Sequence, residues 1–354
     1  MPRRMINKLQ KALTFFAFAI LLFASLACFL PPPPPRNGPI GRPPIGDDAV
    51  SPLSVPDRQF PEQHVTVNAV AFDPTGHWMA TARADGKIAL WDFLPGHLLW
   101  QSEDGSAEVF SLSFRGDGKV LASGGKDGVI KFWDVAAGHL SNSISAKQGE
   151  IRSVVFSPDD RLLASAGSDH SVKLWNPQSR ELVRALNGHT GGVNSVAFSA
   201  NGTILASASS DQSVRLWNPA SGDLLHVLAG HSQPVDALAF RPDGLQLASG
   251  SAIAAPLSHH GGYQMWDIES GTEVATESQK FAVSALAFRP NGRELAIAYR
   301  GDGGYWCINL IALDQDRLLR RYVAHRKGIS AIAFTPDGTW LVSAGHDGAI
   351  RCWH

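Results

Sequence analysis

A short apolar segment that ends in phenylalanine occurs seven times along this chain, with sequences such as VNAVAF, IRSVVF and ISAIAF. Its phenylalanines are Phe72, Phe114, Phe156, Phe198, Phe240, Phe288 and Phe334. The first four intervals between them are each 42 residues, and the next two are 48 and 46. A unit repeated at such a period cannot bury its apolar face alone, so the repeats must stack against one another around a continuous core.

Each repeat contains three apolar runs separated by turns. A turn such as SPDD or RPDG follows the phenylalanine, and the next turn carries Asp85, Asp127, Asp169, Asp211, Asp302 or Asp347. In five of these six repeats the sixth residue after the aspartate is tryptophan, namely Trp91, Trp133, Trp175, Trp217 and Trp353. Short strands separated by turns at a period of about 40–45 residues are typical of propeller blades. The sequence therefore predicts an all-β fold, a seven-bladed β-propeller of four-stranded antiparallel blades.

The repeats also carry two short signatures. Trp91-Asp92, Trp133-Asp134 and Trp266-Asp267 supply one, and Gly188-His189 and Gly230-His231 supply the other. With these signatures the chain resembles the WD-repeat family over residues 54–354. The resemblance implies a propeller that serves as a scaffold for protein–protein interaction.

The fifth and sixth repeats depart from the pattern. Repeat five keeps Trp266 but loses its aspartate to an insertion that contains His259-His260. In repeat six, counting along the chain places Ala298 at the serine position and Ile308 at the tryptophan position, with Trp306 two residues earlier. We expect blade six to depend more on packing than on polar contacts.

The chain ends within the third strand of repeat seven, so the fourth strand of that blade must come from elsewhere. Residues 55–60 occupy a fourth-strand position before repeat one. We expect this N-terminal strand to close the ring. Pro56 lies within this segment and Pro61 directly after it, and an outer edge strand tolerates proline.

The resemblance implies two hydrogen-bonded tetrads. They are His189, Ser207, Asp211 and Trp217, and His325, Ser343, Asp347 and Trp353. The other repeats place Gln63, Gly105, Lys147, His231 and Gln279 at the histidine position. His189, Ser207 and Asp211 also match a hydrolytic triad in composition, but a nucleophile must be accessible and needs an oxyanion site. We therefore interpret the tetrads as structural and expect no catalytic residues.

The first thirty residues differ from the rest. Arg3, Arg4, Lys8 and Lys11 precede an uncharged apolar stretch over residues 12–30, long enough to span about 28 Å as a helix. Residues 1–30 are thus predicted to form a membrane-targeting helix, as an uncleaved signal anchor or a cleaved signal peptide. Small residues precede Cys28, which makes lipid attachment at Cys28 a further alternative.

Residues 31–53 contain nine prolines and three glycines, which predicts an extended Pro-rich linker. The positive charges before the apolar stretch favour a cytoplasmic N-terminus and an extracytoplasmic propeller. The family resemblance favours the opposite location, because WD-repeat propellers are commonly intracellular. We expect membrane association through the N-terminal segment, and secretion after cleavage is the alternative.

The composition of the chain argues against several classes of ligand. The net charge of -1 provides no basic excess for nucleic acid. Three cysteines cannot form a disulfide framework, and His259-His260 lack further ligands for zinc. We expect no metal, no cofactor and a monomeric propeller.

The binding surface is predicted from variability among the repeats. The position four residues before each phenylalanine varies while the apolar positions after it stay uniform, and the residue before the turn aspartate varies too. The candidate partner-binding residues are Asn68, Phe110, Lys126, Arg152, Asn194, Asp236 and His346. Phe110, Lys126 and Arg152 combine an aromatic ring with two cations, as binding hot spots often do. The partner is predicted to be a protein; the alternative is a small ligand or envelope component at the channel mouth.

Overall fold

The structure is a computed structural model that describes residues 54–61, 64–103, 105, 107–251, 261–279 and 282–354. The expectations for residues 1–30, residues 31–53, Cys28 and His259-His260 lie outside these ranges. Within the described ranges, no helix has the length and apolar character needed to cross a membrane.

The described strands form seven antiparallel sheets of four strands each, as the repeats predicted. Blades one to four follow one another along the chain, each built from the centre outward. They are β2 (Val67–Phe72), β3 (Trp78–Arg83), β4 (Ile88–Asp92) and β5 (His97–Gln101); β6 (Val109–Phe114), β7 (Val120–Gly125), β8 (Val129–Asp134) and β9 (Leu140–Ser145); β10 (Ile151–Phe156), β11 (Leu163–Gly167), β12 (Val172–Trp175) and β13 (Leu182–Leu186); β14 (Val193–Phe198), β15 (Leu205–Ser209), β16 (Ser213–Trp217) and β17 (Leu224–Ala229).

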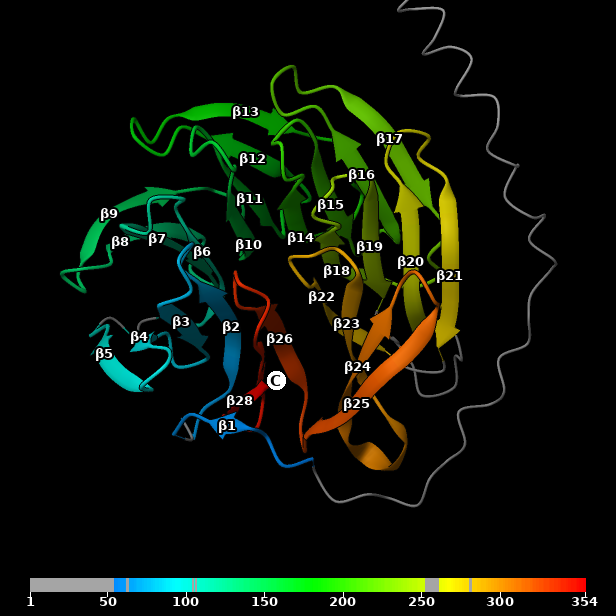
Figure 1. The fold of residues 1–354 in the computed structure, drawn as a ribbon. Coiled ribbons are helices and arrows are strands. Elements are labelled where there is room, and N and C mark those ends of the chain that lie inside the picture. The colour runs from blue at the N-terminus through cyan, green and yellow to red at the C-terminus, as the bar shows by residue number, and fades with distance from the viewer. Residues whose placement is uncertain (1–53, 62–63, 104, 106, 252–260, 280–281) are drawn as a thin grey trace, which may run out of the picture. The chain divides into compact units, whose positions relative to one another are not determined.

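Blades five to seven complete the ring. They are β18 (Val235–Phe240), β19 (Gln246–Ser251), β20 (Gly261–Asp267) and β21 (Glu273–Gln279); β22 (Val283–Phe288), β23 (Glu294–Arg300), β24 (Trp306–Ala312) and β25 (Arg317–His325); β26 (Ile329–Phe334), β27 (Leu341–Gly345), β28 (Ile350–Trp353) and β1 (Arg58–Gln59). A short 3₁₀ turn, η1 (Asp302–Gly304), lies between β23 and β24. Figure 1 shows the innermost strands around a common centre, where β2 contacts β26 as well as β6.

The core lies between the blades rather than inside one layer. Each of seven apolar clusters combines residues of two neighbouring blades. Between blades three and four, for example, Leu174 and Ala164 pack with Val196 and Trp217. Second strands such as β11 and β15 are buried at every residue, which explains their runs of alanine, serine and leucine without alternation.

The N-terminal strand closes the ring, as its position in the sequence predicted. β1 pairs antiparallel with β28, with Arg58 opposite Cys352 and Gln59 opposite Arg351. Phe60 then packs against the rings of Trp91 and Phe93, with centroid distances of 5.4 and 5.9 Å. One short strand thereby joins blade seven to blade one.

Blade six has a different register from the one that counting along the chain predicts. Leu295, the equivalent of Leu205 in blade four, pairs with Ile311, whereas Leu205 pairs with Trp217. The tryptophan position of blade six is therefore Ile311 and not Ile308. Leu286 pairs with Ile297 as Val196 pairs with Ser207, so the serine position is Ile297 and not Ala298. The count failed because the hairpin between β23 and β24 is longer than the equivalent hairpins of blades one to four and seven.

The two faces of the ring differ in their loops. We call the top face the one that carries the turns between second and third strands and the loops that lead into each innermost strand. The bottom face carries the turns after the innermost and third strands. All predicted partner-binding residues belong to the top face.

Candidate functional site

Every innermost strand contains a β-bulge at its second residue. In blade four Val193 pairs with Ser209 and Ser195 pairs with Ala208, so Asn194 has no cross-strand partner. The same shift occurs in all seven blades. The bulged residues, which we call the mouth ring, are Asn68, Phe110, Arg152, Asn194, Asp236, Ser284 and Ser330. A bulge redirects a side chain out of the sheet, and here it does so at the top end of each innermost strand.

Three members of the mouth ring form a polar chain across blades three to five. Arg152 Nη1 donates to Asn194 Oδ1 at 2.5 Å, and Asn194 Nδ2 donates to Asp236 Oδ1 at 2.8 Å. Burial raises the pKa of Asp236 above its usual value, although Arg152 and Asn194 oppose that rise. The guanidinium of Arg152 is thus directed toward blade four.

Asparagine in the mouth ring also bridges neighbouring blades. Asn68 Nδ2 donates to the backbone oxygen of Val109 at 2.9 Å, and Asn194 Nδ2 donates to that of Val235 at 3.0 Å. Phe110 has no polar atom for such a bridge and is half-buried. Its ring is the one large apolar group in the mouth ring.

The remaining candidates lie on turns. Lys126 is exposed, and its backbone N–H donates to Glu108 O at 2.9 Å, two residues before Phe110. The structure therefore brings Phe110 and Lys126 into the same part of blade two. His346 is exposed on blade seven, where its N–H donates to Gly328 O, and it does not join this group.

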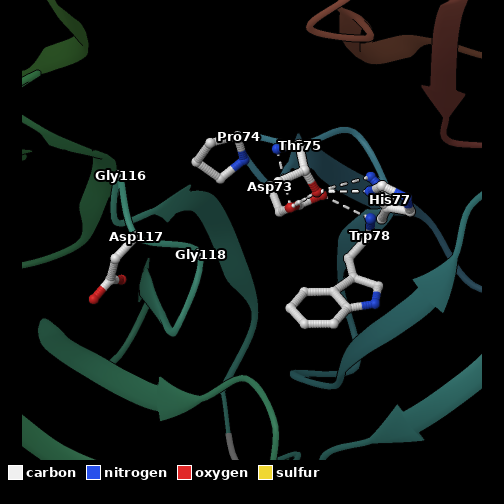
Figure 2. A pocket seen from close by; sticks show the side chains of 8 residues that line it. All are labelled: Asp73, Pro74, Thr75, His77, Trp78, Gly116, Asp117 and Gly118. Carbon is white, nitrogen blue, oxygen red and sulfur yellow. Dashed lines mark hydrogen bonds between the residues drawn. The ribbon is translucent and has the colours of Figure 1, made fainter.

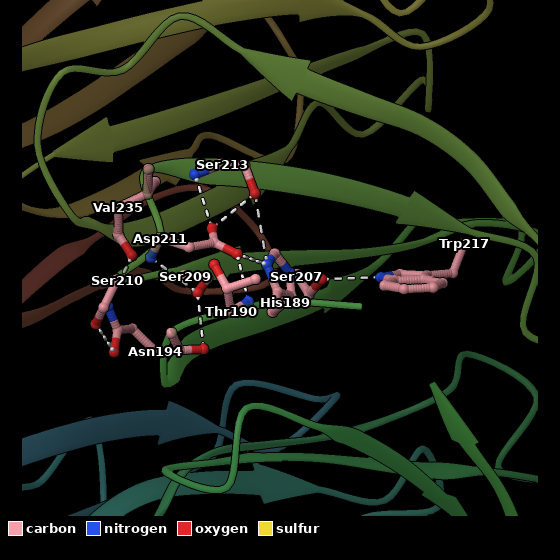
Figure 3. Close-up of polar contacts among 11 residues, drawn as sticks. His189, Thr190, Asn194, Ser207, Ser209, Ser210, Asp211, Ser213, Trp217 and Val235 are labelled. Carbon is pink, nitrogen blue, oxygen red and sulfur yellow. Dashed lines mark hydrogen bonds and ion pairs between the residues drawn. The ribbon is translucent and has the colours of Figure 1, made fainter. Parts of the chain in front are cut away.

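The first tetrad lies inside blade four (Figure 3). His189 Nδ1 is 2.8 Å from Asp211 Oδ2, and His189 Nε2 is 2.8 Å from Ser207 Oγ. Trp217 Nε1 donates to the same Ser207 Oγ at 2.8 Å. The carboxylate also accepts hydrogen bonds from the Ser213 hydroxyl and the Thr190 N–H. The four residues form one continuous network from the turn to the third strand.

This network has triad geometry without nucleophile chemistry. Ser207 has 0% exposed surface, and its oxygen accepts the indole N–H as well as bonding to the imidazole. An attacking oxygen must reach a substrate carbonyl beside oxyanion donors, which a fully buried side chain cannot do. Burial lowers the pKa of His189, while Asp211 opposes that shift. Burial disfavours the Asp211 carboxylate, but the Ser213, Thr190 and His189 hydrogen bonds hold its pKa below the usual value.

The second tetrad repeats the arrangement in blade seven. His325 Nδ1 is 2.8 Å from Asp347 Oδ1, and His325 Nε2 is 2.9 Å from Ser343 Oγ. Trp353 Nε1 donates to Ser343 Oγ at 3.1 Å. Arg351 Nη1 adds a 3.0 Å contact to the other oxygen of Asp347. Six blades share the bond from the tryptophan to a serine or threonine, through Thr81, Ser123, Ser165, Ser207, Ser249 and Ser343.

Blade three fills the histidine position with a residue that the sequence analysis missed. Ser165 Oγ bonds to Gln148 Oε1, and Gln148 Nε2 donates to Ser171 O at 3.1 Å. Lys147, which counting places there, has a φ of 51° and is exposed. The chain therefore turns at Lys147 and directs the next residue inward. In the sequence the signal was a glutamine directly after the expected position, and the structure buries this side chain completely.

Blade five retains part of the network. His231 Nε2 is 2.7 Å from Ser249 Oγ, and burial lowers the pKa of His231 to about 4. An unfolded histidine titrates near pH 6.5, so between these values the unfolded chain binds more protons than the folded one. The folded state consequently loses stability as the pH falls through this window. Burial lowers the pKa values of His189 and His325 in the same direction.

We expect acidification from about pH 7 to about pH 5 to lower the free energy of unfolding, with about 1–2 kcal/mol of that loss due to His231. Replacing His231 with Gln should remove this share of the pH dependence, whatever it does to stability at neutral pH. Denaturant titrations of wild type and H231Q at both pH values measure it. Equal pH-dependent losses in the two proteins would contradict the assignment.

A hollow on the bottom face lies between blades one and two (Figure 2). The turn of residues 73–78 lines one side and Gly116, Asp117 and Gly118 line the other. Asp73 accepts hydrogen bonds from the N–H groups of Thr75 and Trp78 at 3.1 and 2.7 Å. Its carboxylate therefore stabilises the turn rather than facing a ligand.

No group of three or more histidine, cysteine, aspartate or glutamate side chains in the described ranges is arranged to hold a metal ion. The Cys307 and Cys352 side chains are buried. Burial raises the pKa of the Cys352 thiol to about 12, which makes it unreactive.

Comparison with known families agrees with this architecture. The family described as "WD domain, G-beta repeat" matches residues 56–92, 138–176, 180–218, 222–252 and 316–354, together more than half of the chain. The chain belongs to the WD-repeat family. Residues 94–152 also match the family described as "Anaphase-promoting complex subunit 4 WD40 domain". A WD-repeat propeller is an architecture suited to protein–protein interaction.

Two curated relatives share a segment of about one repeat with this WD-repeat protein. Ribosome biogenesis protein erb1 of Botryotinia fuckeliana (strain B05.10) is 37% identical over 46 residues, 13% of this chain and 6% of that protein. WD repeat-containing protein 36 of Homo sapiens is 37% identical over 46 residues, 13% of this chain and 5% of that protein. The match thus spans a small part of each relative and concerns the repeat itself.

Proposed function

We propose that this WD-repeat protein is a scaffold that binds a protein partner through its top face. The observation that carries this proposal is the mouth ring. Seven bulges present five kinds of side chain at the top end of the innermost strands, while the positions that pack between blades remain apolar. Packing does not require that variety, whereas recognition of a partner does.

Phe110 and Lys126 are the proposed centre of the contact. Phe110 is half-buried and bridges no neighbouring blade, and Lys126 is exposed beside it. Arg152 contributes from blade three, where its bond to Asn194 orders the guanidinium. Aromatic and cationic side chains that are already ordered lose little entropy when a partner binds.

The double variant Phe110→Ala with Arg152→Ala should lose the main partner while its melting temperature stays within a few degrees of wild type. Affinity capture from native extracts, compared between variant and wild type, measures the loss. The matched control is Leu94→Ala with Arg161→Ala, since Leu94 is 66% exposed and the Arg161 side chain is 86% exposed on the bottom face. Loss of the partner from the control variant alone would place the contact on the bottom face.

We also propose that the apolar stretch over residues 12–30 tethers the propeller to a membrane, outside the cytoplasm. The support is the length of the stretch and the four positive charges that precede it. Protease added to intact cells or spheroplasts should then digest the propeller or its linker. Complete protection until lysis would show the opposite topology.

A further inference from the structure

The second and third strands of blade six extend farther at the top face than those of blades one, three, four and seven. In blades one, three, four and seven the second and third strands end at pairs such as Ala82–Ile88 and Ala208–Val214. In blade six the equivalent pair is Ala298–Ile308, and the strands continue through Tyr299–Cys307 to Arg300–Trp306. The added length holds Arg300 exposed and Trp306 half-buried at the end of the hairpin.

The outer strand of blade six extends to the same height. His325 pairs with Trp306, and the exposed residues Arg326 and Lys327 follow directly. Gly328 O then accepts the His346 N–H at 2.7 Å, which joins this end of blade six to blade seven. Figure 1 shows β23, β24 and β25 side by side in orange. We call Arg300, Trp306, Arg326, Lys327 and His346 the basic patch.

Elsewhere on the top face, several cations form ion pairs with nearby carboxylates, and the described cations of the basic patch do not. In blades two and three the turn aspartates pair with lysines four residues later, Asp127 with Lys131 at 3.1 Å and Asp169 with Lys173 at 3.5 Å. The Asp347 carboxylate, nearest in blade seven, already bonds to His325 and Arg351. The ion pairs found among the described side chains include none to Arg300, Arg326 or Lys327. Among the described side chains, the three cations of the patch therefore have no carboxylate partner.

We infer that the basic patch binds an acidic peptide segment of the protein partner, an inference that rests on the proposed function of the top face. The hairpin places Arg300, Trp306 and His325 on adjacent strands, so the row from Arg300 to His325 spans roughly 10 Å. That length equals about three residues of an extended peptide, whose carboxylates can pair with Arg300 at one end and with Arg326, the residue after His325, at the other. Trp306 between the cations supplies the apolar contact that hot spots combine with arginine.

A fluorescein-labelled oligoglutamate peptide tests the patch on the full chain by fluorescence anisotropy. We expect the peptide to bind, with oligolysine showing no binding. Reversing both loop charges, Arg326→Glu with Lys327→Glu, should weaken binding about tenfold or more. The matched control is Lys119→Glu with Arg293→Glu, two exposed cations on the bottom face, which should leave binding unchanged.

Two further measurements distinguish the contribution of the charges to peptide binding from that of the tryptophan. Binding should weaken as salt rises from about 0.05 to about 0.5 M, and the charge reversal should flatten that dependence. Trp306→Ser should weaken binding several-fold without changing the salt dependence. Because Arg326 and Lys327 are exposed loop residues, their charge reversal should keep the wild-type melting temperature. Trp306 also packs against the apolar cluster between blades six and seven, so Trp306→Ser should lower the melting temperature, and its binding is compared at a temperature where the variant is folded.

Oligoglutamate binding that is equal in wild type and the charge-reversed protein would overturn the inference. So would a reversal that abolishes binding to phosphatidylserine vesicles and leaves peptide binding intact, since the patch would then be a lipid surface. The peptide assay needs no natural partner. Its failure is therefore distinct from failure of the capture experiment with the Phe110 and Arg152 variants, which tests the proposed function.

Discussion

Removing residues 1–64 should abolish the folded ring, whereas removing residues 1–50 should leave it intact. The longer deletion removes β1 and with it the backbone pairing to β28. It also removes Phe60, which is 2% exposed between Trp91 and Phe93. Loss of one buried phenylalanine side chain typically costs about 3–5 kcal/mol, a large share of the stability of a domain.

The deletion also opens the contact between the first and last blades. Ser54 donates its N–H to Val323 O at 3.1 Å, and Arg58 lies 4.9 Å from the Phe60 ring centroid and 5.6 Å from that of Phe93. Residues 54–60 therefore hold blades six, seven and one together. Without them β28 becomes an unpaired edge that promotes aggregation.

Thermal unfolding and size-exclusion chromatography of the two truncated proteins measure the effect. The protein lacking residues 1–50 should elute as a folded species and melt cooperatively, and the protein lacking residues 1–64 should aggregate. Phe60→Ala in the shorter deletion provides an intermediate case, folded but with a lower melting temperature. Similar melting of both truncated proteins would mean that β1 does not close the ring.

His325→Ala should lower the free energy of unfolding by about 1–3 kcal/mol, because it leaves Asp347 and Ser343 without their shared buried partner. His325 is 0% exposed. His346→Ala is the matched control in the same blade, since His346 is exposed and should change stability by no more than about 0.5 kcal/mol. Denaturant unfolding measures the free energy of unfolding of both variants. Equal losses of free energy in the two variants would show that the tetrad does not stabilise the fold.

The first tetrad allows a chemical test of the same interpretation. Ser207→Ala should reduce stability, because Trp217 and His189 lose a common partner. A fluorophosphonate probe for serine hydrolases should label neither wild type nor variant. Labelling of wild type that disappears in Ser207→Ala would show that the triad geometry is catalytic.

Most of the fold that could be predicted from the sequence was predicted from its repeated segments. Equal spacing of the phenylalanines and tryptophans predicted the blades, and the missing fourth strand in repeat seven predicted the closure by residues 55–60. Both depend on local strand periodicity and on counting, which are reliable where repeats have equal length. The predicted N-terminal helix and Pro-rich linker lie outside the described residues.

Counting residues along the chain gave the wrong position where a hairpin is longer or where a residue has a positive φ. The longer hairpin of blade six moved the tryptophan position from Ile308 to Ile311, and the positive φ of Lys147 placed Gln148 against Ser165. The direction of the Arg152 guanidinium toward Asn194 was equally inaccessible, because it depends on a neighbouring blade. Such details follow from tertiary contacts and not from the periodicity of the sequence.

Crosslinking mass spectrometry with the native partner tests most directly whether the top face is the binding surface. Amine-directed and carboxylate-directed reagents together sample both faces of the propeller. The top-face positions are Lys126, Lys147, Lys327, Glu103, Asp127 and Asp169, and the bottom-face positions are Lys119, Asp117, Asp159, Asp243 and Asp337. Top-face binding predicts partner crosslinks at the first set, concentrated in blades two, three, six and seven. Crosslinks concentrated at the second set would contradict it.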